Sequence, residues 1–212
     1  MKKGCILCLL ISVISLPLIA QNIIYSNLKE LLTQHGDTTA VLRVEKRSRN
    51  QIVLTGGADY RITAGDDESM CRRLKKRCFA VRDEKGNLYL NCRKLRYKKL
   101  RFGAWYAPAV QLGKNIYFCA MPLGSVIGGN FVEEDDVKLG GNIGDALAAS
   151  SLVTKRVCYE LNGETGKVDF LDRMLQLLKN YPELKQAYLK DDSQEAKHTF
   201  KYLLELRNKQ KE

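Results

Sequence analysis

Three times between residues 78 and 171, two short runs of alternating apolar residues stand on either side of a glycine-containing turn. Alternation with a period of two predicts a strand with one buried face, and a glycine turn between two such runs predicts an antiparallel hairpin. The predicted hairpins, with their turns in parentheses, cover residues 78–92 (Lys85–Gly86), 101–122 (Gly113–Asn115) and 154–171 (162–166). The pattern therefore predicts an antiparallel sheet in the middle of the chain.

The N-terminal part of the chain combines helical and strand patterns. Residues 22–35 predict a short helix with Ser26 as its N-cap. Residues 38–63 alternate Val, Leu and Ile with charged residues, which predicts strands that turn near Ser48–Asn50. Residues 65–78 predict a second helix, because one of two adjacent aspartates can cap its start and basic residues fill its last turn.

The C-terminal part has a helical period. Apolar residues at i, i+3, i+4 and i+7 from Leu171 predict one helix, and Asp192 with Glu195 resembles the capping box of a last one. Residues 124–144 contain six glycines and an acidic run, Glu133–Asp136, which predicts a long loop. The sequence therefore predicts a single α+β domain over 21–212, mostly antiparallel and strand-rich over 21–170, with helices from 171–212 packed on it.

The first twenty residues have the pattern of a secretory signal peptide. Lys2 and Lys3 precede an apolar stretch that ends in the small residue Ala20. An uncleaved anchor is the alternative, although seventeen residues are short for a hydrocarbon core of about 30 Å. We expect an exported protein, periplasmic or secreted, that starts at Gln21 and has no transmembrane span after cleavage.

Five cysteines follow the signal peptide, namely Cys71, Cys78, Cys92, Cys119 and Cys158. Because five is odd, at least one thiol is free or pairs with another chain. Cys78 and Cys92 nearly oppose each other in the first hairpin, so an oxidising compartment could join them in a disulfide. A two-residue turn would instead place them on opposite faces, as two buried thiols.

Positive charge is concentrated in one part of the chain. The net charge is +11, and residues 72–101 contain thirteen Lys or Arg against two acids. The densest part is a basic–aromatic segment of eight residues: Arg93, Lys94, Arg96, Lys98, Lys99, Arg101, Trp105 and Tyr106. Two interpretations stay open, and one of them is a surface that binds an anionic glycan or the phosphates of lipopolysaccharide, with Trp105 and Tyr106 stacking on rings. The alternative is a charged edge strand that prevents edge-to-edge pairing.

Motifs for catalysis, metals and cofactors are missing from the sequence. The two histidines, His35 and His198, have no recognisable catalytic partner, the cysteines lack metal-ligand spacing, and no glycine run forms a phosphate loop. We therefore predict a non-catalytic binding or structural module without cofactor or metal, and no nucleic-acid ligand, because the chain is exported. Two alternatives stay open: a carboxylate-based hydrolase or transferase that uses the acids of 124–144, and a component of a cell-envelope assembly that docks through its C-terminal helices.

Three stretches of the chain resemble a known family: "LRVEKRSRNQIVLTGGADYRI", "KKRCFAVRDEKGNLYLNCRKLRYKKLRFGAWYAPA" and "RVCYELNGETGKVDFLDRMLQLLKNYPEL". They are similar to an uncharacterised family of exported Bacteroidetes proteins, classed as a domain of unknown function. The resemblance covers essentially the whole chain after Ala20. It implies a periplasmic or secreted setting and carries over no activity, cofactor or catalytic residue.

Overall fold

The computed structural model describes residues 21–39, 42–123, 154–191 and 195–211. Its strands are β1 Asn22–Tyr25, β2 Asp37–Thr39, β3 Arg43–Lys46, β4 Tyr60–Thr63, β5 Ala80–Arg82, β6 Leu88–Asn91, β7 Arg96–Tyr97, β8 Leu100–Arg101, β9 Tyr106–Leu112, β10 Asn115–Ala120, β11 Val157–Leu161 and β12 Val168–Phe170. They form one sheet in the order β2-β1-β5-β6-β9-β10-β11-β12-β7-β8, and β4 joins β3 to β9. Every pair among the described strands is antiparallel except β12 with β7.

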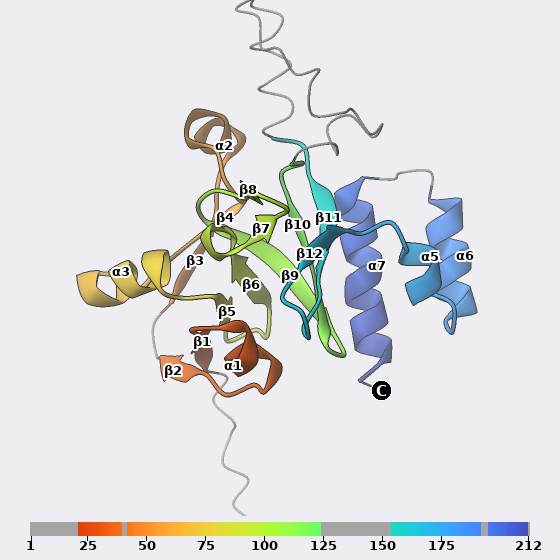
Figure 1. Cartoon of the computed structure of the whole chain (residues 1–212), viewed down its shortest axis with the longest axis horizontal. Coiled ribbons are helices and arrows are strands. Elements are labelled where there is room, and N and C mark those ends of the chain that lie inside the picture. The colour runs from red at the N-terminus through yellow and green to blue at the C-terminus, as the bar shows by residue number, and fades with distance from the viewer. Residues whose placement is uncertain (1–20, 40–41, 124–153, 192–194, 212) are drawn as a thin grey trace, which may run out of the picture.

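All three predicted hairpins are present. β5 pairs with β6, β9 with β10 and β11 with β12, each as antiparallel neighbours. The middle hairpin turns at Gly113, whose φ of 58° is readily adopted only by a residue without a Cβ. The predicted fold class is confirmed: the N-terminal region is strand-rich and the C-terminal helices pack against the sheet (Figure 1).

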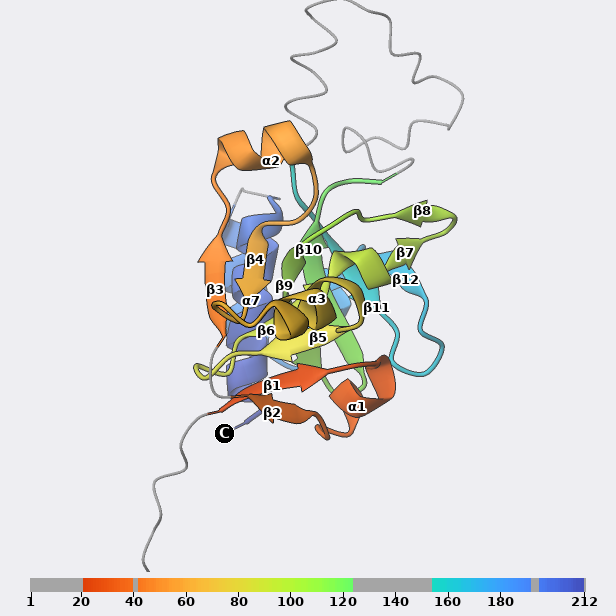
Figure 2. The same cartoon turned by 90° about the vertical axis from the view of Figure 1, so that its left-hand side faces the viewer.

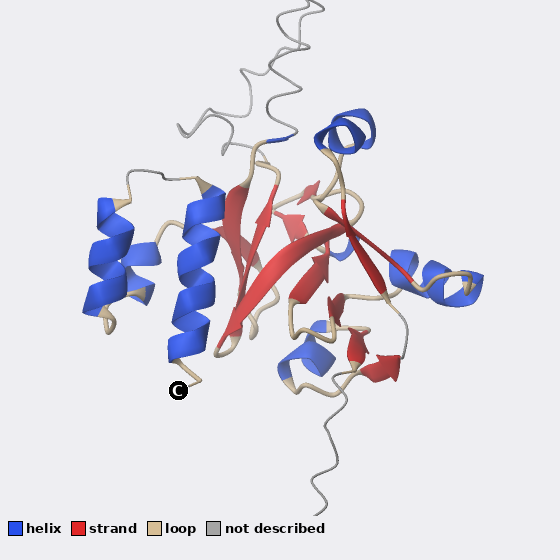
Figure 3. Ribbon diagram, turned by 180° about the vertical axis from the view of Figure 1, so that it is seen from behind, coloured by secondary structure: helices blue, strands red, loops and turns tan. Residues whose placement is uncertain are grey.

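The C-terminal helices are α5 Met174–Leu177, α6 Pro182–Lys190 and α7 Ala196–Lys209. α7 lies against β9, β10 and β11, and α6 packs on the outer side of α7 (Figure 3). Pro182 occupies the first turn of α6, where its missing N–H leaves no helical hydrogen bond unmade. The predicted capping box at Asp192 lies outside the described residues.

Pleating divides the apolar residues of the sheet between two faces. On one face Phe118 and Tyr159 lie in the largest buried cluster. On the other face Val110 and Tyr117 lie in a cluster with the C-terminal helices. A third cluster on that second face lies under α3, where Val81 and Tyr89 alternate with residues of the first cluster. Each face therefore has its own core.

The predicted helix over 22–35 is partly wrong. Its first residues form β1, which pairs with β2 and β5, and the helix α1 covers only Leu28–Leu32. Asn27, and not Ser26, is the N-cap, since its side chain accepts a hydrogen bond from the Glu30 N–H at 2.9 Å. The β-branched and aromatic side chains of β1 gain burial in the sheet, which overrides the local helical preference.

A second correction concerns the stretch predicted as a strand after Ser48. Residues Arg49–Thr55 form helix α2. Ser48 and Gln51 make a capping box, because the Ser48 hydroxyl accepts from the Gln51 N–H at 3.3 Å and the Gln51 side chain accepts from the Ser48 N–H at 2.8 Å. Capping at the first turn, a local signal, favours a helix despite the β-branched residues that follow.

The predicted helix over 65–78 is confirmed as α3, Glu68–Lys76. Asp67 caps it by accepting a hydrogen bond from the Met70 N–H at 2.8 Å. Leu74 is fully buried against the sheet, while the basic residues face outward. The amphipathic pattern of this helix therefore fits its position.

The basic segment folds as a 3₁₀ turn, η1 Cys92–Lys94, followed by the tight β7–β8 hairpin. Lys98 lies at the turn with a φ of 51°. This turn leaves Leu100 exposed. The hairpin lies on the side of the sheet opposite α7 (Figure 2).

Several expectations fall outside the described residues: the signal peptide over 1–20, the acidic run Glu133–Asp136 and the loop that contains it. The division into a signal peptide and one domain over 21–212 thus stays a prediction. Within the described part of the chain, no helix has the length and apolar character that a bilayer crossing requires.

Candidate anion-binding groove

The six predicted cations of the basic segment are all exposed on η1 and the β7–β8 hairpin, namely Arg93, Lys94, Arg96, Lys98, Lys99 and Arg101. Among the residues that the structure describes, none of the six forms an ion pair with an acid. Arg73, elsewhere in the basic region, does pair with Asp37. The hairpin therefore presents an uncompensated positive surface.

Apolar side chains of the same segment hold the hairpin on the sheet. Leu95, Tyr97 and Phe102 are buried in the largest cluster. The Phe102 ring lies edge-on to Phe118 and Tyr159, with centroid distances of 5.4 and 4.8 Å. The alternation of cations with aromatic residues thus reflects two roles, since the aromatic side chains anchor the hairpin and the cations face the solvent.

The two aromatic residues predicted to stack on a ligand have different positions. Tyr106 is only 3% exposed, and its hydroxyl donates a hydrogen bond to the Leu74 carbonyl at 2.8 Å. Its ring belongs to the core under α3, so its role is structural. Trp105 is half-buried and lines a surface groove.

This groove, of about 450 Å³, is the candidate site. Three of the predicted site residues line it, namely Arg93, Trp105 and the largely buried Tyr106. Three further cations from separate elements complete its basic lining: Arg43 of β3, Arg61 of β4 and Lys75 of α3. Two acids also line it, and one of them, Glu45, is already paired with Arg43 at 3.3 Å. The groove therefore has an excess of positive charge.

The pairing of β3 with β4 explains why Arg43 and Arg61 meet. Glu45 lies opposite Arg61, and Arg43 lies opposite Thr63, so alternate residues of both strands point to the groove. Sequence reasoning missed these two arginines because they lie outside the dense basic segment. The alternation of charged with apolar residues in 43–46 and 60–63 was the signal that could have placed them on one face.

Trp105 is held in place by its backbone. Its φ is 76°, which is unusual for a bulky residue, and its carbonyl accepts a hydrogen bond from the Cys92 N–H at 2.9 Å. The neighbouring Ala104 carbonyl accepts from the Ala58 N–H at 3.0 Å. Gly57 makes this approach possible, since a Cβ there would lie 2.5 Å from the Ala104 oxygen and 2.9 Å from Trp105 Cδ1.

Two guanidinium groups lie over the indole ring, Arg47 at 5.0 Å and Arg61 at 5.8 Å from the centroid. Arg47 is buried and donates hydrogen bonds to the carbonyls of Gly56, Ala58 and Gln51 at 2.8, 2.7 and 2.9 Å. Burial lowers the pKa of Arg47, although the charge of the nearby Asp59 opposes the shift. Arg47 thus ties the end of α2 to the loop that carries Trp105, whereas Arg61 is exposed in the groove.

Cys78 and Cys92 are free, buried thiols in the structure. Cys78 packs in the cluster under α3 and its thiol donates to the Ala80 carbonyl at 3.1 Å, whereas Cys92 packs in the cluster on the other face. Cys92 faces the same side as Leu90, whereas Cys78 ends the last turn of α3, where its N–H donates to the Arg73 carbonyl at 3.0 Å, so the two side chains lie on opposite faces. The structure corresponds to the alternative of two buried thiols, and it does not contain the predicted disulfide.

The described residues include no cluster of three or more His, Cys, Asp or Glu that could hold a metal ion. The two histidines lie away from the groove: the His35 ring contacts the Thr33 carbonyl at 2.6 Å, and His198 pairs with Asp191 at 2.9 Å. The side chains of the groove include guanidinium and ammonium groups beside an indole ring, which are suited to electrostatic and stacking contacts.

The comparisons with known proteins identify a family. No curated protein and no solved structure matches the chain. Residues 23–210, nearly all of the sequence after the predicted signal peptide, match the family of unknown function DUF6563, and the chain belongs to this family.

Proposed function

We propose that this protein is an exported, non-catalytic binding protein for anionic glycan polymers, and that the Trp105 groove and the β7–β8 hairpin hold the ligand. The observation that carries the proposal is the group of six exposed cations without a described acidic partner, beside a groove lined by Arg43, Arg61, Lys75 and Arg93. Grouped like charges repel each other in the free protein, so a polyanion would relieve that repulsion.

Trp105 favours a glycan as the anionic polymer. An indole ring offers a flat apolar face that packs against the apolar face of a sugar ring, while the surrounding guanidinium groups pair with carboxylate, sulfate or phosphate oxygens. The fixed backbone of Trp105 keeps this face in place before the ligand arrives, which lowers the entropy that binding costs. The signal-peptide pattern and the resemblance to exported Bacteroidetes proteins support a setting in which such polymers occur.

Binding of heparin, a sulfated glycan, tests the proposal. We expect saturable binding at low salt that weakens steeply as the ionic strength rises through about 0.15 M, where the Debye length is about 8 Å. Reversal of five cations, Arg93→Glu, Lys94→Glu, Arg96→Glu, Lys98→Glu and Lys99→Glu, should reduce the affinity about a hundred-fold. Lipopolysaccharide in a parallel assay distinguishes phosphate groups from sulfates as the preferred anion.

A control must separate local recognition from net charge. Lys179 and Lys190, both exposed, lie on the C-terminal helical side of the molecule. A variant with Lys179→Glu and Lys190→Glu should keep most of the affinity, while Arg93→Glu with Lys94→Glu, which has the same net charge, should lose most of it. Equal losses in these two variants would show attraction by net charge alone and would contradict the proposal.

The two alternatives from the sequence differ in their support. The carboxylate-based hydrolase or transferase relied on acids of 124–144, which lie outside the described residues. The cell-envelope assembly would use exposed apolar residues of the C-terminal helices, and two leucines there, Leu175 and Leu189, are 43% and 57% exposed. Their exposure favours no particular partner, so anion binding remains the function that the geometry supports best.

A further inference from the structure

Two of the remaining cysteines lie side by side on the helix-covered face of the sheet. Cys119 of β10 and Cys158 of β11 are direct partners in the strand register, and their sulfur atoms are 2.7 Å apart. Directly opposed residues of antiparallel strands have Cα atoms about 4.5–5.5 Å apart, within the range of about 4.4–6.8 Å that a disulfide requires. Both thiols are free in the structure.

We infer that Cys119 and Cys158 form a cross-strand dithiol that a small-molecule disulfide oxidises to an intramolecular disulfide. The register already places both side chains on the same face, in the cluster with the C-terminal helices. No change of backbone path is needed to join them, in contrast to Cys78 and Cys92, which lie in clusters on opposite faces. The inference is independent of anion binding.

The two thiols differ in their surroundings and therefore in their reactivity toward an external reagent. The Ala196 carbonyl at the start of α7 lies within hydrogen-bond reach of both thiols, at 3.6 Å from Cys119 and 3.5 Å from Cys158. The hydrogen bond that Cys119 shares with Cys158, together with burial, raises the pKa of Cys119 well above its usual value. At neutral pH Cys119 is therefore protonated and reacts slowly with an external reagent.

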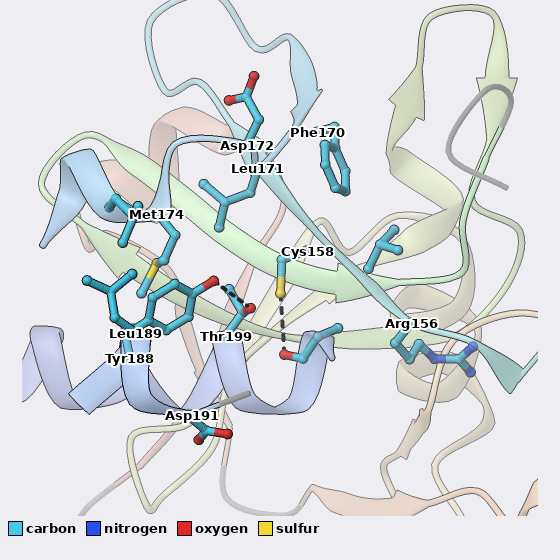
Figure 4. A pocket seen from close by; sticks show the side chains of 13 residues that line it. Arg156, Cys158, Phe170, Leu171, Asp172, Met174, Tyr188, Leu189, Asp191 and Thr199 are labelled. Carbon is cyan, nitrogen blue, oxygen red and sulfur yellow. Dashed lines mark hydrogen bonds between the residues drawn. The ribbon is translucent and has the colours of Figure 1, made fainter. Parts of the chain in front are cut away.

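Cys158, in contrast, lines a cavity of about 470 Å³ between β11, β12 and the C-terminal helices (Figure 4). Apolar side chains from three elements share this lining, among them Phe170, Met174 and Tyr188. Cys119 is not part of the lining. A reagent that enters the cavity thus meets the sulfur of Cys158 first, and Cys119 lies behind it at contact distance.

The reaction proceeds by two exchanges. Cys158 loses its proton, and its thiolate attacks one sulfur of a disulfide RS–SR; the S–S bond breaks, and one RS⁻ leaves and takes up a proton. The Cys119 thiolate, formed by loss of its proton, then attacks the Cys158 sulfur of the mixed disulfide and releases the second RS⁻, which is protonated in turn. Two protein thiols are oxidised by two electrons, and RS–SR is reduced to two RSH.

The expected bond would connect the strands on either side of a long connection. The two cysteines are 39 positions apart, and most of the chain between them lies outside the described residues. A cross-link of this length restricts the unfolded chain, so oxidation should raise the melting temperature by roughly 10 °C. Cys71, Cys78 and Cys92 would remain as thiols, in agreement with the odd number of cysteines after the signal peptide.

Peptide mapping of the full chain after equilibration with oxidised glutathione tests the inference. We expect a Cys119–Cys158 cross-linked peptide, a mass lower by two hydrogens and a higher melting temperature, all reversed by dithiothreitol. In Cys119→Ser the glutathionyl group should stay on Cys158, because no thiol is present to release it. In Cys158→Ser the native protein should not take up glutathione at Cys119.

Cys78→Ser with Cys92→Ser is the matched control, which changes two buried thiols elsewhere and should leave the cross-link unaffected. The inference is overturned if the native chain keeps both thiols after equilibration, or if the mapped bridge joins other cysteines. Thiol counting and peptide mapping on the unmodified chain distinguish these outcomes without any variant, so a serine variant that fails to fold would not prevent the test.

Discussion

Charged residues are distributed differently on the two sides of the sheet. On the side of the C-terminal helices, acids lie among the cations: Glu160 pairs with Arg173, Asp191 with His198 and Glu205 with Lys201, while other cations there, such as Lys179 and Lys190, form no ion pair within the described residues. On the side of the β7–β8 hairpin, the six cations from Arg93 to Arg101 have no acidic partner in the described chain. Exposed pairs stabilise a fold only slightly, but an unpaired group of like charges stabilises nothing. The two sides therefore differ in how acids are distributed among the cations, and the grouped cations of the hairpin are the basis of the proposed ligand site.

The largest effect should come from removing the anchor of the hairpin. Phe102 is 1% exposed and packs edge-on to two aromatic rings, so Phe102→Ala should lower the free energy of unfolding by about 3–5 kcal/mol. Urea denaturation measures this loss. Leu100→Ala, on the same hairpin but exposed, should change it by less than about 0.5 kcal/mol. Similar losses in both variants would show that the hairpin is not anchored as described.

The second effect concerns charge and not packing. The five-site reversal from Arg93 to Lys99 should leave the free energy of unfolding within about 1 kcal/mol of the wild type, because the five side chains are exposed and have no ion-pair partner among the described residues to lose. The same variant should lose about a hundred-fold in heparin affinity. Denaturation and binding measured on one preparation separate the effect on stability from the effect on heparin affinity. A large loss of stability would mean that these cations have structural partners.

The third effect tests the loop that carries Trp105. Gly57 has a φ of 82°, and a Cβ there would lie 2.5 Å from the Ala104 oxygen, so Gly57→Ala should cost about 2 kcal/mol of stability. Gly65→Ala is the matched control, since Gly65 also has a positive φ but nothing within 4 Å of its Cβ position. It should cost about 1 kcal/mol, from backbone strain alone. An equal loss of stability in both variants would contradict a contribution from the close approach of residue 57 to Ala104.

A smaller effect distinguishes the buried thiols from Cys71. Burial raises the pKa of Cys78 to about 11 and of Cys92 to about 12, from 9.0 in both cases. At pH 8.5 iodoacetamide should therefore modify Cys71 in the native protein and leave the other two unreacted, while in urea all three react. The neutral thiols contribute stability that is complete below about pH 9 and is lost as the pH rises toward 11–12. Fast native labelling of Cys92 would contradict its burial.

Local patterns predicted the hairpins and α3, because alternation, turn glycines and caps act within a few residues. They failed at β1, whose partner β5 lies more than fifty residues along the chain, so its pairing energy has no local signal. They failed at α2 because its β-branched residues indicate a strand, while the capping box that favours a helix is a weaker signal. The candidate groove was partly predicted. Arg93, Trp105 and Tyr106 lie in the dense segment, while Arg43 and Arg61 join them only through the pairing of β3 with β4.

Fluorescence of Trp105, the only tryptophan in the sequence, tests the proposed binding site most directly. Titration with a heparin oligosaccharide should change the emission in a saturable way and protect the indole from acrylamide quenching. The midpoint should move to higher ligand concentration as salt is added. Heparin that binds, as measured by calorimetry, while the emission and quenching of Trp105 stay unchanged would contradict a ligand site in this groove.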